Sequence, residues 1–199
     1  MNITYLYHEV ETHFPRIFKP ETSQYNPDPI YSIRIELGDK NSPAYQKVCE
    51  TLWDACIKVY GETEGEAFFN RNVINGKTAM IQRDKKSGTF YTTAKRKAKE
   101  GAPRVKDKDL ERVLEEDDFI FTDGDICNVA VEFWLPEEKD SKGKLASTDF
   151  VSQRLRGVGR LRPGTPWTGG SGVATDEELG LEPQNDETDR KVDNPFARS

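Results

Sequence analysis

A strict alternation of apolar and polar side chains limits what this chain can fold into. Between Tyr31 and Leu37, apolar residues occupy the odd positions and Ser32, Arg34 and Glu36 the even ones. A period of two predicts a strand with one face in a core and the other in water. The same pattern predicts a strand over 126–135 whose inward face carries Cys127, Val129, Val131, Phe133 and Leu135.

Further strands are predicted from shorter patterns. Two runs, 78–83 and 89–95, flank a glycine-containing loop of hairpin length. A short strand is expected over Phe14 to Phe18, and another over 154–162. These strands do not alternate with helices, which argues against a doubly wound sheet. The expected fold is mainly β (α+β), a five-stranded small barrel into which helices are inserted.

One long and one short helix are predicted as these insertions. Apolar residues recur at three- and four-residue steps from Tyr45 to Tyr60, which is typical of an amphipathic helix. Ser42 suits its N-cap, Pro43 its first position and Gly61 its end. The shorter helix is expected over 109–116.

Charge divides the chain into two parts. The 199 residues carry a net charge of −6, yet residues 171–199 hold eight acidic and three basic residues, a charge of −5. Residues 77–106 hold ten basic and two acidic residues, a charge of +8. The last segment is also poor in apolar residues, so it cannot offset the entropy of ordering its backbone. We therefore expect a folded domain over 1–170 and a disordered acidic tail over 171–199.

Several classes of protein are excluded by the sequence. No apolar run is long enough for a transmembrane helix, and the first residues do not form a secretion signal. Three cysteines without a C-x-x-C motif argue against a disulfide framework and against a cysteine-based zinc site. These features predict a soluble protein of a reducing cytoplasm.

The segment from Phe90 to Lys99 joins aromatic residues to a run of cations. Phe90 and Tyr91 begin the second strand of the predicted hairpin, and four basic residues follow: Lys95, Arg96, Lys97 and Lys99. Single-stranded nucleic acid needs both kinds of side chain, because cations bind phosphates and flat rings stack on bases, at about 1–3 kcal/mol per base. The alternative is that Phe90 packs in the core and the lysines protect an exposed strand edge.

Four arginines lie close together near the end of the predicted domain. In a strand, Arg154, Arg156, Arg160 and Arg162 would point to one side, with no acidic residue nearby in the sequence. Like charges on one face repel one another unless an anion or carboxylates neutralise them, so the pattern favours a bound anion. The glycines at 157 and 159 would let another backbone or a ligand approach closely. Alternatively, the arginines pair with the acidic stretch 115–118 or with the tail.

The tail has two possible roles beside a cationic groove. A polyanionic segment on the same chain competes with DNA at a high effective concentration. Asp193 and Phe196, near the end of the tail, could also dock partner proteins. The alternative is a tail that only keeps the protein in solution.

Motifs for catalysis are lacking in the sequence. His8 and His13 have no zinc-site spacing around them, and no phosphate-binding loop or nucleophile elbow is present. Asp123, Asp125 and Glu132 could hold a nuclease metal, but they are explained more simply by a turn and the polar face of a strand. We therefore expect no enzyme activity, no cofactor and no metal.

A series of short motifs spans about residues 8–170. They are Phe14-Pro15-Arg16-Ile17-Phe18-Lys19-Pro20, the strand from Tyr31 to Leu37, Phe90-Tyr91 leading to Ala102-Pro103-Arg104-Val105, Asp123-Gly124-Asp125 before the strand to Trp134, the segment from Arg154 to Arg162, and Gly169-Gly170. In this order they resemble a family of bacteriophage single-stranded-DNA-binding proteins with an OB fold, long known only as a domain of unknown function. The resemblance implies a partly open barrel that holds the strand across one face, no catalysis, and often an acidic C-terminal tail that contacts replication proteins.

We therefore predict a sequence-independent single-stranded-DNA-binding protein that coats and protects DNA in phage replication or recombination, in the host cytoplasm. The residues expected to bind phosphates are Lys95, Arg96, Lys97, Lys99, Arg104, Lys106, Arg154, Arg156, Arg160 and Arg162. Those expected to stack on bases are Tyr31, Tyr91, Trp134 and Trp167. Two alternatives stay open: a protein-interaction or assembly factor without DNA binding, and a metal-dependent nuclease accessory.

Overall fold

The computed structural model describes residues 1–23, 26–110, 112–115, 121–137 and 150–165. The chain divides into two units, Met1–Trp167 and Thr168–Ser199, and all described residues belong to the first. The predicted tail over 171–199 lies outside the described residues, as do Trp167, Asp193 and Phe196. In the described ranges, no helix is long and apolar enough to cross a bilayer.

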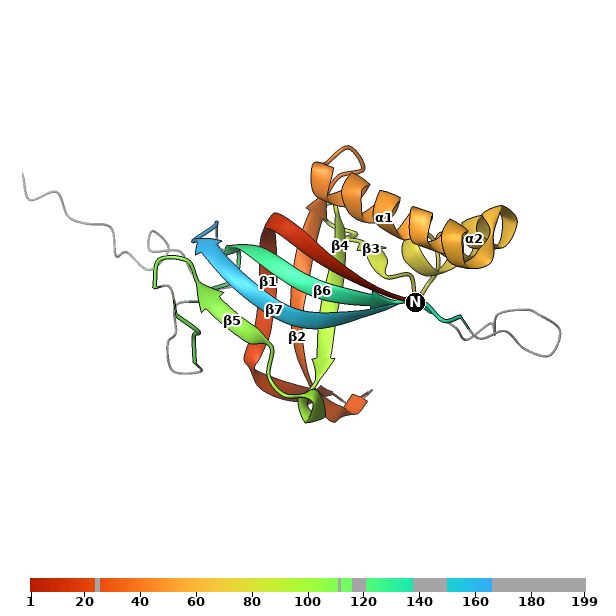
Figure 1. Ribbon diagram of the computed structural model, residues 1–199. Coiled ribbons are helices and arrows are strands. Elements are labelled where there is room, and N and C mark those ends of the chain that lie inside the picture. The colour runs from red at the N-terminus through yellow and green to blue at the C-terminus, as the bar shows by residue number, and fades with distance from the viewer. Residues whose placement is uncertain (24–25, 111, 116–120, 138–149, 166–199) are drawn as a thin grey trace, which may run out of the picture. The chain divides into compact units, whose positions relative to one another are not determined.

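Strands dominate the first unit (Figure 1). Those in the described residues are β1 (Asn2–Ser23), β2 (Asn26–Gly38), β3 (Ile81–Arg83), β4 (Phe90–Lys97), β5 (Arg104–Asp107), β6 (Ile126–Trp134) and β7 (Ser152–Arg162). Their order in the sheet is β3-β4-β2-β1-β6-β7-β5, and a further parallel pairing joins β4 to β7. This pairing closes β1, β2, β4, β7 and β6 into the predicted five-stranded barrel, an OB-type architecture. The strands β3 and β5 extend the sheet beside β4 and β7.

Two helices between β2 and β3 lie across one end of the barrel (Figure 1). Helix α1 (Pro43–Tyr60) has the predicted bounds, with Ser42 before it and Gly61 after it at a φ of 83°. It buries Val48 and Leu52 in the main core, as its apolar stripe predicted. Helix α2 (Glu62–Phe69) follows directly and leads into a π-helical turn, η1 (Asn70–Ile74). The helices therefore act as an insertion that covers the barrel.

The predicted short helix over 109–116 is wrong, and α2 is the short helix of the fold. After β5 the described residues form a turn, and Lys106 then pairs with Val113 in an isolated bridge. The backbone N–H of Leu114 donates to the carbonyl of Val105 at 2.8 Å. The chain thus returns antiparallel to β5 within a few residues, which leaves no room for a helix.

Strand β1 departs twice from regular alternation, so the sequence pattern predicted only residues 14–18 of it. Tyr5 and Tyr7 are buried, but after Glu9 the buried positions become Val10 and Thr12. Glu9 has a φ of 49° and Phe14 a φ of 50°, and the pairing register shifts at both places. Such bulges bend a strand and strengthen its twist, so one long strand can follow the curve of the barrel. The predicted strand over 14–18 is the central part of β1.

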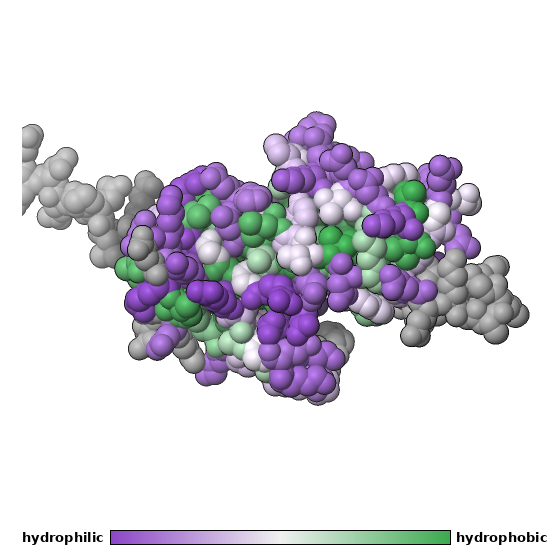
Figure 2. All heavy atoms as spheres, viewed as in Figure 1, coloured by the Kyte–Doolittle hydropathy of each residue, from purple (hydrophilic) through white to green (hydrophobic). Residues whose placement is uncertain are grey.

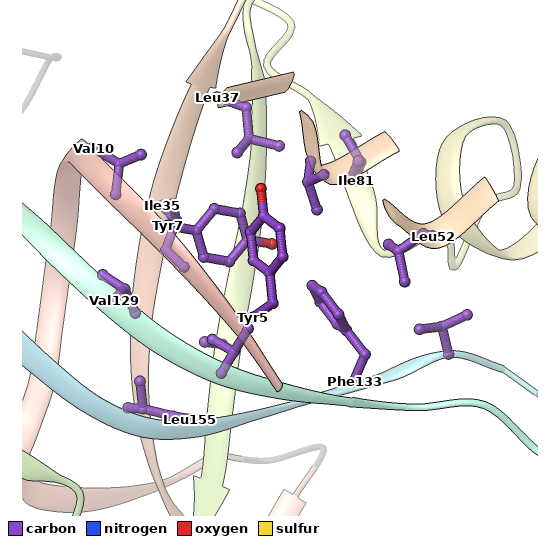
Figure 3. Close-up of a cluster of buried hydrophobic side chains, with 14 of the residues drawn as sticks. Tyr5, Tyr7, Val10, Ile35, Leu37, Leu52, Ile81, Val129, Phe133 and Leu155 are labelled. Carbon is purple, nitrogen blue, oxygen red and sulfur yellow. The ribbon is translucent and has the colours of Figure 1, made fainter. Parts of the chain in front are cut away.

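The core fills the barrel and continues to α1 (Figure 3). Tyr5 and Tyr7 of β1 meet edge to face with ring centroids 4.8 Å apart, and Phe133 of β6 lies 5.5 Å from Tyr5. All five inward positions predicted for the strand over 126–135 are fully buried. The polar positions of β2, β4 and β6 are thereby fixed on the outer face, where a ligand can reach them.

Candidate nucleic-acid interface

An open groove of about 620 Å³ lies on the outside of the barrel along β4. It extends from β4 over β3 and the start of β7, and Ile30 of β2 also lines it. Its lining includes the β4 side chains Tyr91, Thr93, Lys95 and Lys97, together with Phe150 and Arg154. Its size falls within the range of ligand-binding clefts. Cationic, aromatic and uncharged polar side chains therefore share one concave surface.

Lys95 and Lys97 give the groove its unpaired positive charge. On β4, Thr92 and Ala94 point into the core, so the two lysines are exposed on the outer face. None of the ion pairs within the described residues includes either lysine. Both ammonium groups are therefore available to an external anion.

More exposed cations continue the charge from β4 to β5. They lie on the short 3-10 helix η2 (Ala98–Glu100) and on β5, and are Lys99, Arg104 and Lys106. On β5, Val105 and Asp107 are buried, so the basic residues between them point outward. Figure 2 shows hydrophilic residues gathered over the end of the barrel that carries η2 and the β1–β2 hairpin.

Arg96 lines the groove, but its guanidinium is engaged by the backbone. It donates to the carbonyls of Gly101 at 2.6 Å, Glu100 at 2.5 Å and Leu155 at 3.3 Å. These contacts tie the end of β4 to the turn after η2 and to β7. The geometry gives Arg96 a structural role and leaves it few donors for a phosphate.

The prediction that the four arginines of β7 share one face is wrong. Ala130 pairs with Gly157 and Val131 with Leu155, so Arg156 is an extra residue that reverses the alternation of β7. Arg154 and Arg156 lie outside the barrel, with 40% and 52% of their side chains exposed, whereas Arg160 turns inward and is 14% exposed. The bulge separates Arg160 from the other arginines.

Arg160 forms a structural cluster with two buried carboxylates. Its guanidinium lies 2.9 Å from the carboxylate of Asp107 and 2.7 Å from that of Asp125. Burial opposes ionisation of Asp107, but hydrogen bonds from Arg160 and from backbone amides outweigh it and lower the pKa of this carboxyl. Arg160 thus joins β7 to β5 and to the turn before β6, and its charge is neutralised within the protein.

The other arginines of β7 also have acidic neighbours, contrary to prediction. Arg154 lies 3.0 Å from Glu100 and 3.8 Å from Glu132, and Arg156 lies 3.4 Å from Glu132. Arg162 lies 3.8 Å from Glu9. These partners are distant in the sequence, so a local charge pattern could not reveal them. Exposed pairs of this kind are weak, and a phosphate can compete for the arginines.

Among the aromatic candidates, Tyr91 and Trp134 are on the outer face and Tyr31 is not. Tyr31 is only 9% exposed and shares the inward face of β2 with Ile33 and Ile35, so the prediction that it stacks on a base is wrong. Trp134 is 46% exposed at the end of β6, where it pairs with Ser152 of the groove lining. Phe150 was not predicted, yet it is 56% exposed in the groove. A lone aromatic residue before a strand offers no pattern that could have identified it.

The ring of Tyr91 is covered in part by an arginine from β2. The Cζ atom of Arg34 lies 3.8 Å from the ring centroid. Glu36 and Asp84 hold the guanidinium at 2.5 Å and 3.1 Å. Backbone amides of Lys86 and Ser87, and then Arg34, lower the pKa of Asp84 to about 2, so this carboxylate stays ionised at neutral pH.

The carboxylates considered for a nuclease metal do not form a site. Asp123 and Asp125 lie in the predicted turn, where Gly124 has a φ of 90°. Asp125 is bound by Arg160 and Thr122, and Glu132 lies beside the arginines of β7. In the part of the chain that the structure describes, no three histidine, cysteine or acidic side chains are grouped to hold a metal ion. The three cysteines are free thiols, and burial raises the pKa of Cys56 and Cys127 to about 12.

The fold is similar to those of solved bacteriophage proteins. A single-stranded DNA-binding protein from bacteriophage Enc34, solved with a C-terminal truncation, is 16% identical over 83% of this chain and 88% of its own, with a TM-score of 0.56. The same phage protein in complex with ssDNA gives 16% identity over 83% and 89%, with a TM-score of 0.51. The protein gp2.5 of bacteriophage T7, a single-stranded DNA-binding protein, gives 16% identity over 94% and 96%, with a TM-score of 0.50. No family model matches the chain, and no curated protein matches its sequence.

Proposed function

We propose that this chain binds single-stranded DNA, without regard to base sequence, in the groove along β4. The observation that carries the proposal is that one concave surface holds aromatic side chains together with cations that have no ion pair within the described residues. Lys95 and Lys97 lie on the same strand face as Tyr91, and Phe150, just before β7, lines the same groove. Phosphates would bind the lysines while bases stack on the rings, the combination that sequence-tolerant binding to single strands requires.

The proposed phosphate contacts are those cations that remain exposed on this side of the barrel. They are Lys95, Lys97, Lys99, Arg104, Lys106, Arg154 and Arg156. Arg96 and Arg160 are left out because their guanidinium groups are held by backbone carbonyls and by buried carboxylates. Arg162 would contact a phosphate only if the bound DNA extends to the far end of β7.

The comparisons support the proposal through the fold. An OB-type barrel presents its second and third strands, here β2 and β4, as a binding face. Three matched structures are described as single-stranded DNA-binding proteins, and one of them holds ssDNA. We therefore propose that the chain binds single-stranded DNA without catalysing a reaction, in phage replication or recombination.

For residues 171–199, a charge of −5 supports a second proposal. This acidic segment would compete with DNA for the cationic groove. Asp193 and Phe196 would dock replication or recombination proteins when DNA displaces the tail. Residues 1–170 would then be sufficient for DNA binding.

Titration with a pyrimidine oligonucleotide tests the function, with intrinsic tryptophan fluorescence as the readout. Trp134 is exposed beside the groove, so quenching by the single strand and much weaker quenching by a matched duplex are expected. Binding should weaken as salt increases, because phosphate contacts release counterions. No binding to either nucleic acid at low salt would overturn the proposal and favour a protein-interaction factor whose basic surface faces an acidic protein.

A further inference from the structure

We propose that Arg34 is a positioning residue for the groove: it holds Tyr91 as the wall on which a base stacks, and it binds no phosphate itself. The inference rests on the proposed function and assigns a role to a basic residue that lies outside the Lys-rich and Arg-rich segments. The binding face would then hold two kinds of basic residue: residues such as Lys95, which bind DNA phosphates, and Arg34, which orients an aromatic ring.

The charge of Arg34 is neutralised within the protein. Glu36 lies on its own strand and Asp84 in the loop after β3, and the two carboxylates bind different nitrogens of the guanidinium. Arg34 and both partners are about four-fifths buried, with side-chain exposures of 15% and 17%. A phosphate at this guanidinium would meet two negative charges at close range. Arg34 is therefore a poor phosphate ligand, unlike the unpaired Lys95.

The guanidinium of Arg34 stacks on the ring of Tyr91 across the β2–β4 ladder. In the β2–β4 ladder Glu36 pairs with Tyr91 and Arg34 with Thr93, so Arg34 is the diagonal neighbour of Tyr91 on the outer face. Its guanidinium crosses the ring at 3.8 Å on its way to Asp84. A tyrosine whose ring is held by a fixed planar cation loses little further freedom when a base stacks on it.

The part of the Tyr91 ring that Arg34 does not cover lies at the groove. Tyr91 lines the groove, whereas Arg34, Glu36 and Asp84 do not. The surface of the ring that Arg34 leaves uncovered therefore borders the groove. Phe150, Met80 and Thr93 lie around the same space, so a base that enters it meets apolar walls beside Tyr91. Lys95 and Lys97 continue along the same face of β4, at the place where the phosphates of that nucleotide would pass.

The test compares variants of the full chain for affinity and for salt dependence. We expect Arg34→Gln to weaken binding to a pyrimidine oligonucleotide about fivefold, on the scale of a lost cation–π contact, with the slope of log affinity against log salt unchanged. Lys95→Gln, the matched control, should flatten that slope by about 0.7. Arg34→Lys keeps a cation near the ring and should recover part of the affinity. Thermal unfolding of each variant shows whether it is folded.

A double-mutant cycle with Tyr91→Leu completes the test. The variant Arg34→Gln/Tyr91→Leu should bind no more weakly than Tyr91→Leu alone, because Arg34 acts through the ring. The inference is overturned if Arg34→Gln flattens the salt slope as Lys95→Gln does, if it binds like the wild type, or if the two substitutions are additive. In each of those cases wild-type binding and the Lys95→Gln effect still support the function. No binding by the wild type would instead overturn the proposed function, and this inference with it.

Discussion

At the scale of single residues, the partners of a basic side chain decide what it can do. Lys95 is exposed and has no ion pair within the described residues, whereas Arg160 lies against two carboxylates that are almost completely buried. From the sequence alone, Lys95 and Arg160 were equal candidates for phosphate contacts. The structure separates them, because only the first has a charge that an external anion can meet.

The role of Arg160 can be tested by unfolding. Arg160→Ala would leave Asp107 and Asp125 buried without a counter-charge, which typically costs about 3–5 kcal/mol. Arg162→Ala is the matched control on the same strand: Arg162 is 57% exposed and lies 3.8 Å from an exposed Glu9, so its loss should cost less than about 1 kcal/mol. Denaturant titration gives both free energies of unfolding. Equal losses in the two variants would show that Arg160 does not hold the barrel together.

At the scale of elements, close contacts between strands depend on glycine. A Cβ atom at Gly157 would lie 2.9 Å from the carbonyl oxygen of Arg104 on β5, whereas one at Gly159 would lie 3.9 Å from its nearest neighbour, the carbonyl oxygen of Asn128. The sequence predicted that these glycines admit another backbone or a ligand. At Gly157 the neighbour is the backbone of β5.

Alanine at the two positions therefore has different effects. Gly157→Ala should push β5 away from β7 and destabilise the protein by about 1–3 kcal/mol, the usual range for overpacking. Gly159→Ala introduces only an ordinary van der Waals contact, so its free energy of unfolding should change by much less. Chemical denaturation of the two variants measures the difference. A Gly157→Ala variant as stable as Gly159→Ala would contradict the close packing of β5.

The elements that sequence patterns predicted are those with an unbroken period. β6 and α1 lie where their patterns predicted, and β2 follows the predicted alternation from Tyr31 to Leu37, although the strand begins earlier, at Asn26. The first part of β1 was missed because the bulge at Glu9 changes which side chains face inward. In the same way, the bulge at Arg156 sends Arg160 into the protein. Bulges arise from three-dimensional pairing, so alternation alone could not predict either change.

The sequence predicted the basic residues of the candidate site, but not all of the side chains that surround them. The run from Tyr91 to Lys97 was recognised because aromatic residues and lysines follow one another on one strand. Phe150 and Arg34 were not recognised as part of a site, because their places depend on the contact between β4 and its neighbours. Distant acidic partners such as Glu132 were also hidden for that reason.

At the scale of the whole molecule, opposite charges lie in different parts of the chain. Residues 77–106 carry +8 and residues 171–199 carry −5. If the tail competes with DNA, a chain truncated after Gly170 should bind single strands more tightly than the full chain. The difference should shrink as salt rises, since screening weakens the attraction between tail and groove. Equal affinities of the two chains at low salt would show that the tail does not compete.

Whether single-stranded DNA lies in the groove along β4 can be decided by the salt dependence of binding, measured for the wild type and for Lys95→Gln/Lys97→Gln. Each phosphate contact on a single strand contributes about 0.7 to the slope of log affinity against log salt, so the double variant should have a slope flatter by about 1.4. The loss should be the same for every base sequence, because phosphates carry no sequence information. A double variant that binds with the affinity and slope of the wild type would show that DNA does not lie in the groove along β4.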